Sequence, residues 1–268
     1  MKWLKINHKG QEVYGVLEGD TIHLSKHTWD DILSEKRFDA TESLRMDAAR
    51  LLNPIGRPGK IVCVGLNYMD HCRETNTSPP ERPLLFTKFT TSIIGPDEEI
   101  VWHADLTKEV DFEAELGVVI GKNCRRVNQE DALEYVAGYT AANDVSARDI
   151  QMGDGQWVRG KSLDTFCPLG PVFTTRNEIP NPQQLAIRSI LNGEVMQDSS
   201  TKEMIFSVAQ IVSFCSQAFT LEPGDLILTG TPHGVGLGRD PKLYMQDGDV
   251  IVVEIEGIGR LENRCRVV

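Results

Sequence analysis

Beyond residue 60 the sequence is dominated by short apolar and β-branched segments separated by glycine, proline and asparagine. These segments have the pattern of strands, and they cover 60–65, 83–88, 110–120, 138–144, 185–191, 194–198, 225–229 and 250–256. Asn192-Gly193 predicts a tight hairpin between two of them, because both residues tolerate a positive φ. Only about 201–219 has a long apolar stripe at helical spacing, which is suited to covering a sheet. The chain is therefore predicted to be a β-rich α+β protein.

Residues 1–55 are predicted to form a small N-terminal α/β module. A hairpin is expected from 13–17 and 21–24, followed by two short helices. The first helix begins after Thr28, which has Asp31 in capping-box spacing, and the second covers 43–52. The proline- and glycine-rich segment 53–60 is the predicted linker. Residues 60–268 then form the large domain, in which a further helix is expected over 129–137 after Asn128.

The charge balance and the apolar runs exclude several classes of partner. There are 28 Lys and Arg against 39 Asp and Glu, a formal net charge of −11, which repels nucleic acid and anionic membrane surfaces. Apolar runs such as 61–64 are far shorter than the roughly 18 residues of a membrane helix, and no signal peptide is recognised. Six cysteines without a C-x-x-C pair predict reduced thiols and a cytoplasmic location.

Three acidic residues alternate with apolar residues at the start of the segment 110–120. Strand geometry places Asp111, Glu113 and Glu115 on one face, where they repel one another unless something neutralises them. A solvated sheet face, with Lys108 and Lys122 nearby, is one interpretation. The residues after Glu115 are apolar on both faces, as in a buried strand, and this favours a site for a hard cation.

A third cation ligand is expected from Asp144, at the end of the predicted strand 138–144, where a carboxylate can reach into a cleft. Arg148 and Gln151 are three residues apart and would share one face of a short helix. Together with a cation they suit a small anionic substrate with an adjacent carbonyl group, although Arg148 alone is equally compatible with a surface ion pair. Asp149 has capping-box spacing and is interpreted as structural.

A candidate acid–base pair precedes these residues. If the chain turns helical after residue 65, Tyr68, His71 and Glu74 share one face. A histidine backed by a carboxylate has a fixed tautomer and raised basicity, as a general base requires. The alternative is a structural histidine, because H-x-x-E is a weak motif. The proline-rich segment 75–83 is either a lid hinge or a simple loop.

Several common catalytic motifs are missing from the sequence. There is no G-x-x-x-x-G-K-[ST] and no G-x-G-x-x-G opening a helix, so a nucleotide fold is unsupported. Neither G-x-S-x-G nor H-E-x-x-H occurs, which disfavours a serine triad and a zinc protease site.

Taken together, the blocks GLNYMDHCRE, PLLFTKFTTSIIGP, DFEAELGVVIGK, NDVSARDIQ, GKSLDTFCPLGP and PGDLILTGTPHGVG resemble the fumarylacetoacetate hydrolase superfamily. They run in order from about residue 60 to the end of the chain. Two departures stand out: the N-terminal module is unlike that of fumarylacetoacetase, and Phe89 replaces a proline found in many relatives.

The resemblance implies a mixed β-sandwich roll, a homodimer and a set of site residues. Glu113, Glu115 and Asp144 would hold Mg²⁺, sometimes replaced by Mn²⁺ or Ca²⁺. The implied catalytic residues are His71, Glu74 and Lys161, and the implied substrate-binding residues are Tyr68, Arg148, Gln151 and Thr231. His71 and Glu74 would activate water as a lid closes, and Lys161 with Gln151 would support an oxyanion.

The leading hypothesis from the sequence is hydrolytic C–C cleavage of a small anionic 2-oxo acid of the acylpyruvate type, through a metal-stabilised enolate. Oxaloacetate tautomerisation or decarboxylation, and isomerisation of a hydroxy-dienedioate, need the same residues and remain open. A non-catalytic protein that binds a 2-oxo acid or Mg²⁺ is the third class, which the joint presence of His71 and Glu74 disfavours.

Overall fold

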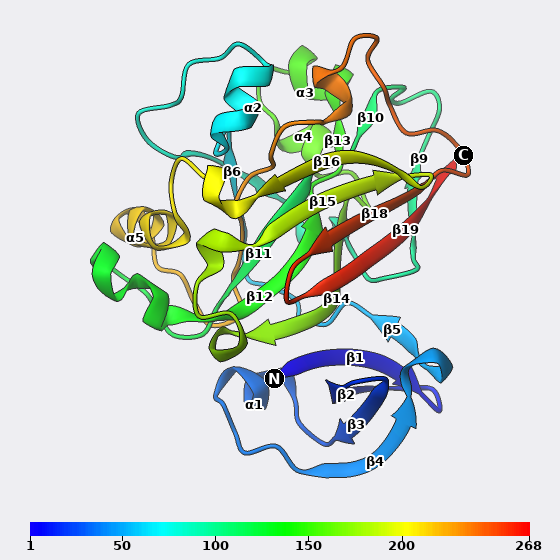
Figure 1. Ribbon diagram of the computed structural model, residues 1–268, viewed down its shortest axis with the longest axis vertical. Coiled ribbons are helices and arrows are strands. Elements are labelled where there is room, and N and C mark those ends of the chain that lie inside the picture. Colours follow the sequence, from blue (N-terminus) through cyan, green and yellow to red (C-terminus); the bar gives the residue numbers. More distant parts are fainter.

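One mixed sheet of twelve strands runs through the molecule in a computed structural model that describes residues 1–268 (Figure 1). Its main path is β4-β3-β2-β1-β14-β12-β11-β17-β6-β7, with β5 paired to β1 and β8 to β14. The strands are β1 (Lys2–His8), β2 (Gln11–Glu18), β3 (Thr21–Ser25), β4 (Ala40–Arg45), β5 (Arg50–Leu52), β6 (Ile61–Gly65), β7 (Leu84–Lys88), β8 (Ile93–Ile94), β11 (Ala114–Ile120), β12 (Val136–Asn143), β14 (Cys167–Thr175) and β17 (Leu226–Leu228). The pairs β17·β6 and β14·β8 are parallel, so the sheet is mixed.

A second, five-stranded sheet packs against the first in the order β16-β15-β18-β19-β9. Its strands are β9 (Glu99–Trp102), β15 (Ala186–Leu191), β16 (Glu194–Ser200), β18 (Val250–Ile255) and β19 (Gly259–Val267). One buried apolar cluster joins Leu116 and Val118 of the first sheet to Val253 and Leu261 of the second. The predicted β-rich α+β class with two packed sheets is therefore confirmed.

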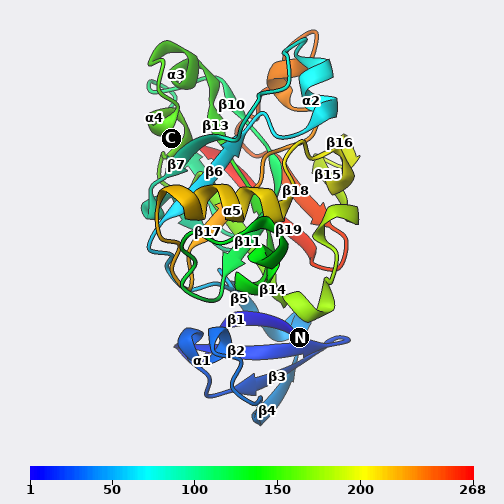
Figure 2. The same ribbon diagram turned by 90° about the vertical axis from the view of Figure 1, so that its left-hand side faces the viewer.

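Five short helices and one two-stranded ribbon complete the fold. They are α1 (Trp29–Leu33), α2 (Met69–Glu74), α3 (Arg148–Gly153), α4 (Val158–Lys161) and α5 (Val208–Ala218), with the ribbon formed by β10 (Val110–Asp111) and β13 (Ser146–Ala147). Figure 2 shows α5 lying across the sheets, with α2 and α3 at the end opposite the N-terminal strands. None of the helices has the length and apolar character needed to cross a bilayer. All six cysteines are buried and free.

The N-terminal strands confirm one prediction and correct another. The hairpin of β2 and β3 and the Thr28–Asp31 capping box of α1 are both present. The helix predicted over 43–52 is wrong, because this segment contains the end of β4, the 3-10 turn Met46–Ala48 and β5. Pairing of β4 with β3 and of β5 with β1 outweighs a weak helical pattern. Since β1 also pairs with β14, these strands continue the main sheet, and the predicted division at 53–60 stays a prediction.

Two predicted helices also differ from the structure. The segment 201–219 divides into a 3-10 turn, Thr201–Glu203, and α5, which starts after Ser207 because Ser207 and Gln210 form a capping box. The segment 129–137 is a 3-10 helix, Gln129–Tyr135, without a side-chain cap from Asn128. It ends there because Val136 opens β12 and pairs with Ile120.

Candidate metal centre and active site

Three buried carboxylates converge where the central strands β11 and β12 meet. Ala114 of β11 lies opposite Asn143 of β12, so Glu113 and Glu115, on either side of Ala114, come close to Asp144, which follows Asn143. One oxygen from each carboxylate lies within 4.8 Å of the others. The convergence of Glu113, Glu115 and Asp144 that the sequence predicted is therefore present.

The predicted strand 110–120 is interrupted, and this separates Asp111 from the other two acidic residues. The Glu113 N–H donates to the Asn143 side chain at 2.9 Å instead of continuing the strand ladder. Asp111 belongs to β10, and its Oδ2 accepts from Arg148 Nη2 at 2.7 Å. Its oxygens also accept the N–H groups of Gly236 and Leu237. The predicted strand is therefore divided, and Asp111 lies outside the cluster of Glu113, Glu115 and Asp144, joined to Glu113 through Arg148.

Cationic side chains neutralise two of the three convergent carboxylates. Lys161 Nζ lies 2.8 Å from Glu113 Oε2 and 2.9 Å from Asp144 Oδ2. Arg148 Nη1 lies 2.7 Å from Glu113 Oε1, and Lys88 Nζ lies 2.5 Å from Asp144 Oδ1. Glu115 takes part in no ion pair, and its Oε2 accepts the Gly230 N–H at 2.7 Å. Glu115 is thus the carboxylate whose charge the protein leaves unbalanced.

The pKa values of these carboxyl groups diverge for the same reason. Burial opposes ionisation of Glu113, but Lys161 and Arg148 outweigh it and lower its pKa to about 2. Burial, reinforced by the charges of Asp144 and Glu113, raises the pKa of Glu115 well above its usual range. A divalent cation would offset the repulsion between these carboxylates. Convergent carboxylate oxygens are also the donors that hard cations prefer. The residues present therefore fit a divalent metal.

Helix α2 carries the predicted acid–base pair. His71 Nδ1 lies 3.0 Å from Glu74 Oε2, and Glu74 Oε1 accepts the Gly234 N–H at 2.9 Å. Burial raises the pKa of Glu74, but the hydrogen bonds from His71 and Gly234 outweigh burial and lower it. The start of the helix is fixed by Asp70, whose Oδ2 accepts from the Ser199 hydroxyl at 2.5 Å. Glu74 is therefore an anion, and its carboxylate orients the imidazole by contacting Nδ1.

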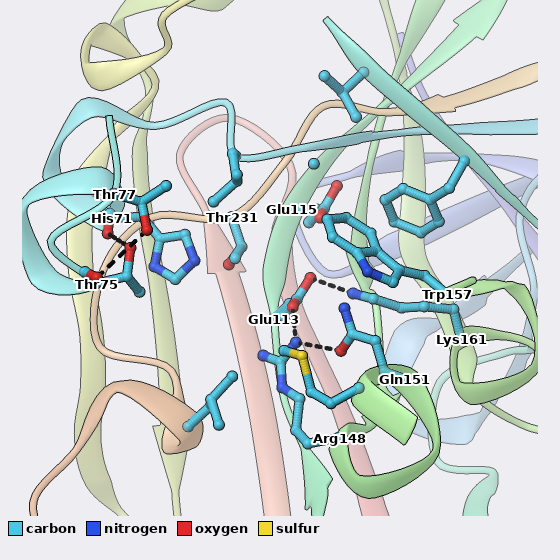
Figure 3. Close-up of a pocket in the computed structure, with 16 residues that line it drawn as sticks. His71, Thr75, Thr77, Glu113, Glu115, Arg148, Gln151, Trp157, Lys161 and Thr231 are labelled. Carbon is cyan, nitrogen blue, oxygen red and sulfur yellow. Dashed lines mark hydrogen bonds and ion pairs between the residues drawn. The ribbon is translucent and has the colours of Figure 1, made fainter. Parts of the chain in front are cut away.

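Glu113, Glu115 and His71 face one pocket of about 300 Å³ (Figure 3). The predicted site residues that line it are His71, Glu113, Glu115, Arg148, Gln151, Lys161 and Thr231. Glu74 and Asp144 do not line it and contact it through His71 and Lys161. Tyr68 is fully buried outside the lining, and its hydroxyl has no partner. Phe89 is exposed and also lies outside the lining.

Several residues of this site were not assigned from the sequence. The loop 75–83 supplies Thr75 and Thr77, and the segment between α3 and α4 supplies Trp157. Lys88, within the TKF block, is fully buried against Asp144, a contact that no local pattern could indicate. Asp149 is structural, as interpreted, but not as a cap: its carboxylate accepts from the Thr107 hydroxyl at 2.6 Å.

Asn67 fixes the strained backbone that leads into α2. The preceding Leu66, which lines the pocket, has a positive φ of 53°. Asn67 is fully buried, donates to the carbonyls of Phe206 and Thr229, and accepts the Phe206 N–H. Replacing Asn67 by alanine is expected to lower the free energy of unfolding by about 3 kcal/mol, because the buried Thr229 carbonyl and two partly buried backbone groups of Phe206 lose their partner.

Urea denaturation of the purified variant measures this loss. Asn177, which is exposed and makes no side-chain hydrogen bond, provides the matched control, and its replacement by alanine is expected to cost less than about 0.5 kcal/mol. Equal stability of the two variants would contradict the assigned role of Asn67.

This chain is similar to a known protein family, to a curated relative and to solved structures. The family model for the fumarylacetoacetate (FAA) hydrolase C-terminal region matches residues 60–266. The mitochondrial oxaloacetate tautomerase Fahd2a of Rattus norvegicus is 48% identical over 214 residues, 80% of this chain and 68% of the rat protein. The structure of a fumarylacetoacetate hydrolase from Exiguobacterium antarcticum is 42% identical, covers 100% of both chains and has a TM-score of 0.92. A 2-hydroxyhepta-2,4-diene-1,7-dioate isomerase from Mycobacterium marinum is 38% identical, with a TM-score of 0.85 over 100% of this chain and 98% of the isomerase.

Proposed function

The chain belongs to the fumarylacetoacetate hydrolase family, as its sequence blocks predicted, and we propose that it is a divalent-metal-dependent enzyme that transfers a proton between carbon and oxygen of a small 2-oxo acid. Keto–enol tautomerisation of oxaloacetate, the reaction named for the rat relative, is the model reaction. The observation that carries the proposal is a buried carboxylate triad, two of whose members line one pocket with His71, the histidine of a hydrogen-bonded His–Glu pair.

Each site residue has a role in this reaction. Mg²⁺ held by Glu113, Glu115 and Asp144 would supply a Lewis acid for the carboxylate and oxo oxygens of the substrate. His71 takes a proton from the carbon next to the oxo group and delivers it to the oxo oxygen, which becomes the enol hydroxyl, while Glu74 fixes the tautomer of the imidazole.

The remaining side chains hold the substrate and stabilise charge. Lys161 places its ammonium group where negative charge develops on the oxo oxygen. Gln151, whose Oε1 accepts from Arg148 at 3.0 Å, keeps its amide N–H groups free for the same oxygen, and Arg148 and Thr231 orient the acid.

Hydrolytic C–C cleavage of an acylpyruvate, the leading hypothesis from the sequence, is the second candidate. It is favoured by the ionised state of Glu74, because a histidine backed by an anion can remove a proton from water. Proton transfer is preferred because it needs no ordered water and because the rat relative is named for it. Isomerisation of a hydroxy-dienedioate, named for the mycobacterial relative, also moves a proton, from the enol oxygen to a carbon of the conjugated chain.

Metal removal tests the proposed function. Oxaloacetate and acetylpyruvate are supplied with Mg²⁺ or with EDTA, and enol absorbance and released pyruvate are followed separately. Loss of enol absorbance is expected to accelerate by at least about a hundredfold with Mg²⁺, to stop in EDTA and to return when Mg²⁺ is restored. Pyruvate release from acetylpyruvate would favour hydrolysis instead, and turnover that persists in EDTA would refute both.

Assembly and location belong to the same proposal. A homodimer is proposed from the family resemblance, and light scattering of the purified protein tests it. A cytoplasmic location is proposed because all six cysteines are free and buried, as suits a reducing compartment.

A further inference from the structure

The pocket has two regions of opposite chemical character. Charged and hydroxyl side chains line part of it, whereas Phe86 and Trp157, which contact each other, form an apolar part, called here the apolar subsite. Figure 3 shows Trp157 beside Lys161 and on the opposite side of the pocket from His71. A substrate whose acid group lies at the triad therefore extends its other end toward this region.

Trp157 is held in place by two independent contacts. Its indole packs edge-on against Phe86, with ring centroids 5.4 Å apart and an interplanar angle of 70°. Its other contact is with Gly65, where a Cβ atom would come within 2.5 Å of the indole. Because these contacts already hold the Trp157 side chain, it loses little conformational entropy when a ligand packs on it.

The apolar subsite is continuous with the charged region. Lys161 Nζ lies 5.2 Å from the centroid of the Phe86 ring, so one aromatic ring borders both. Trp157 is only partly buried and lines the pocket, which leaves apolar surface for a ligand to cover. Covering this surface with an apolar group is favourable, because it removes both surfaces from water.

The pocket has no lysine or arginine for a second acid group beyond Arg148 and Lys161, which the proposed function assigns to the first acid group and the oxo oxygen. Arg148 is paired with Asp111 and Glu113, and Lys161 with Glu113 and Asp144. The remaining titratable base, His71, contacts Glu74. A carboxylate placed against the apolar subsite would be desolvated without a partner, which is costly.

We propose that the apolar subsite binds the uncharged tail of the substrate and that Trp157 determines this specificity. The preferred substrate class is then a 2-oxo acid with one carboxylate and an aryl or alkyl tail, larger than the four-carbon diacid oxaloacetate. This inference rests on the proposed function for turnover, but the binding that it describes does not require turnover.

Kinetics with two substrates test the inference. Tautomerisation of phenylpyruvate and of oxaloacetate is measured with the Mg²⁺-loaded full-length enzyme, and kcat/KM is expected to be about tenfold higher for phenylpyruvate. Trp157→Ala is expected to lower kcat/KM for phenylpyruvate about tenfold, mainly through KM, and to change that for oxaloacetate less than about threefold. Trp157→Phe should restore most of the phenylpyruvate activity. Trp29→Phe, in α1, is the matched control without effect.

A binding measurement separates failure of the inference from failure of the proposed function. N-phenyloxamate and oxamate, which resemble 2-oxo acids but do not react, are titrated into the Mg²⁺-loaded protein by calorimetry. Wild-type protein is expected to bind N-phenyloxamate about tenfold more tightly than oxamate, and Trp157→Ala to remove this difference. With that result and no tautomerisation, the proposed function fails and the subsite stands. Equal binding of the two probes, or an equal loss for both in Trp157→Ala, would overturn the subsite.

Discussion

Replacing Glu115 by glutamine is expected to lower metal-dependent kcat/KM by about a thousandfold or more and yet leave the metal-free protein at least as stable as the wild type. Activity falls because one of three convergent oxygens loses its charge. Stability is kept because the amide oxygen of the new side chain can still accept the Gly230 N–H, while a buried charge without a cationic partner disappears. Calorimetric titration with Mg²⁺ and thermal unfolding in EDTA measure the two effects.

The matched variant Glu113→Gln distinguishes two effects: the loss of a negative charge from the triad, and the loss of a counter-ion for buried cations. It removes the same charge from the triad, but it deprives Lys161 and Arg148 of a buried counter-ion. Glu113→Gln is therefore expected to lower the free energy of unfolding of the metal-free protein by about 3 kcal/mol, unlike Glu115→Gln. Wild-type Mg²⁺ affinity in Glu115→Gln would rule out Glu115 as a metal ligand.

Replacing His71 by asparagine is expected to reduce kcat by about a hundredfold to ten-thousandfold with no change in Mg²⁺ affinity. The imidazole is the proposed general acid–base group; it lines the same pocket as Glu113 and Glu115 and does not belong to the triad. The measurement is kcat at saturating Mg²⁺, together with Mg²⁺ titration of the variant. Tautomerisation that survives while acylpyruvate hydrolysis is lost would mean that the two reactions use different proton-transfer groups.

His233 provides the control for this variant. It is also a histidine near α2, with Nε2 3.9 Å from Asp70 Oδ2, but it is 44% exposed and does not line the pocket. His233→Asn is expected to keep kcat within about twofold of the wild type, as is usual for exposed positions without a special contact. If His71→Asn and His233→Asn behave alike, His71 has no special part in proton transfer.

Local periodicity was enough to predict the central part of the site. Strand alternation placed Glu113 and Glu115 on one face, and the i, i+3 spacing in α2 predicted the contact between His71 and Glu74. It did not foresee the break after Asp111, where the Glu113 N–H donates to the Asn143 side chain and interrupts the strand. It also failed over 43–52, where pairing with distant strands decides the conformation.

Contacts between distant segments could not be predicted in this way. Lys88 and Asp144 are 56 residues apart, and they meet only because the sheet is assembled from many strands. Strand β14 was missed because Pro168, Gly170 and Pro171 act as breakers in any local pattern. Strand β19 was missed for a different reason: charged residues occupy its outward positions and hide the buried ones.

The three carboxylates and the other pocket-lining residues belong to different kinds of structural element. Glu113, Glu115 and Asp144 sit on or beside paired strands in the middle of the sheet, whereas His71, Met152 and Trp157 belong to short helices and connecting segments near its edge. A length change in one of those connections would reshape the chamber without shifting the cation ligands. The same carboxylate cluster can thus be combined with different pocket-lining residues. This gives a structural reason why relatives sharing this architecture carry the names of a tautomerase, an isomerase and a hydrolase.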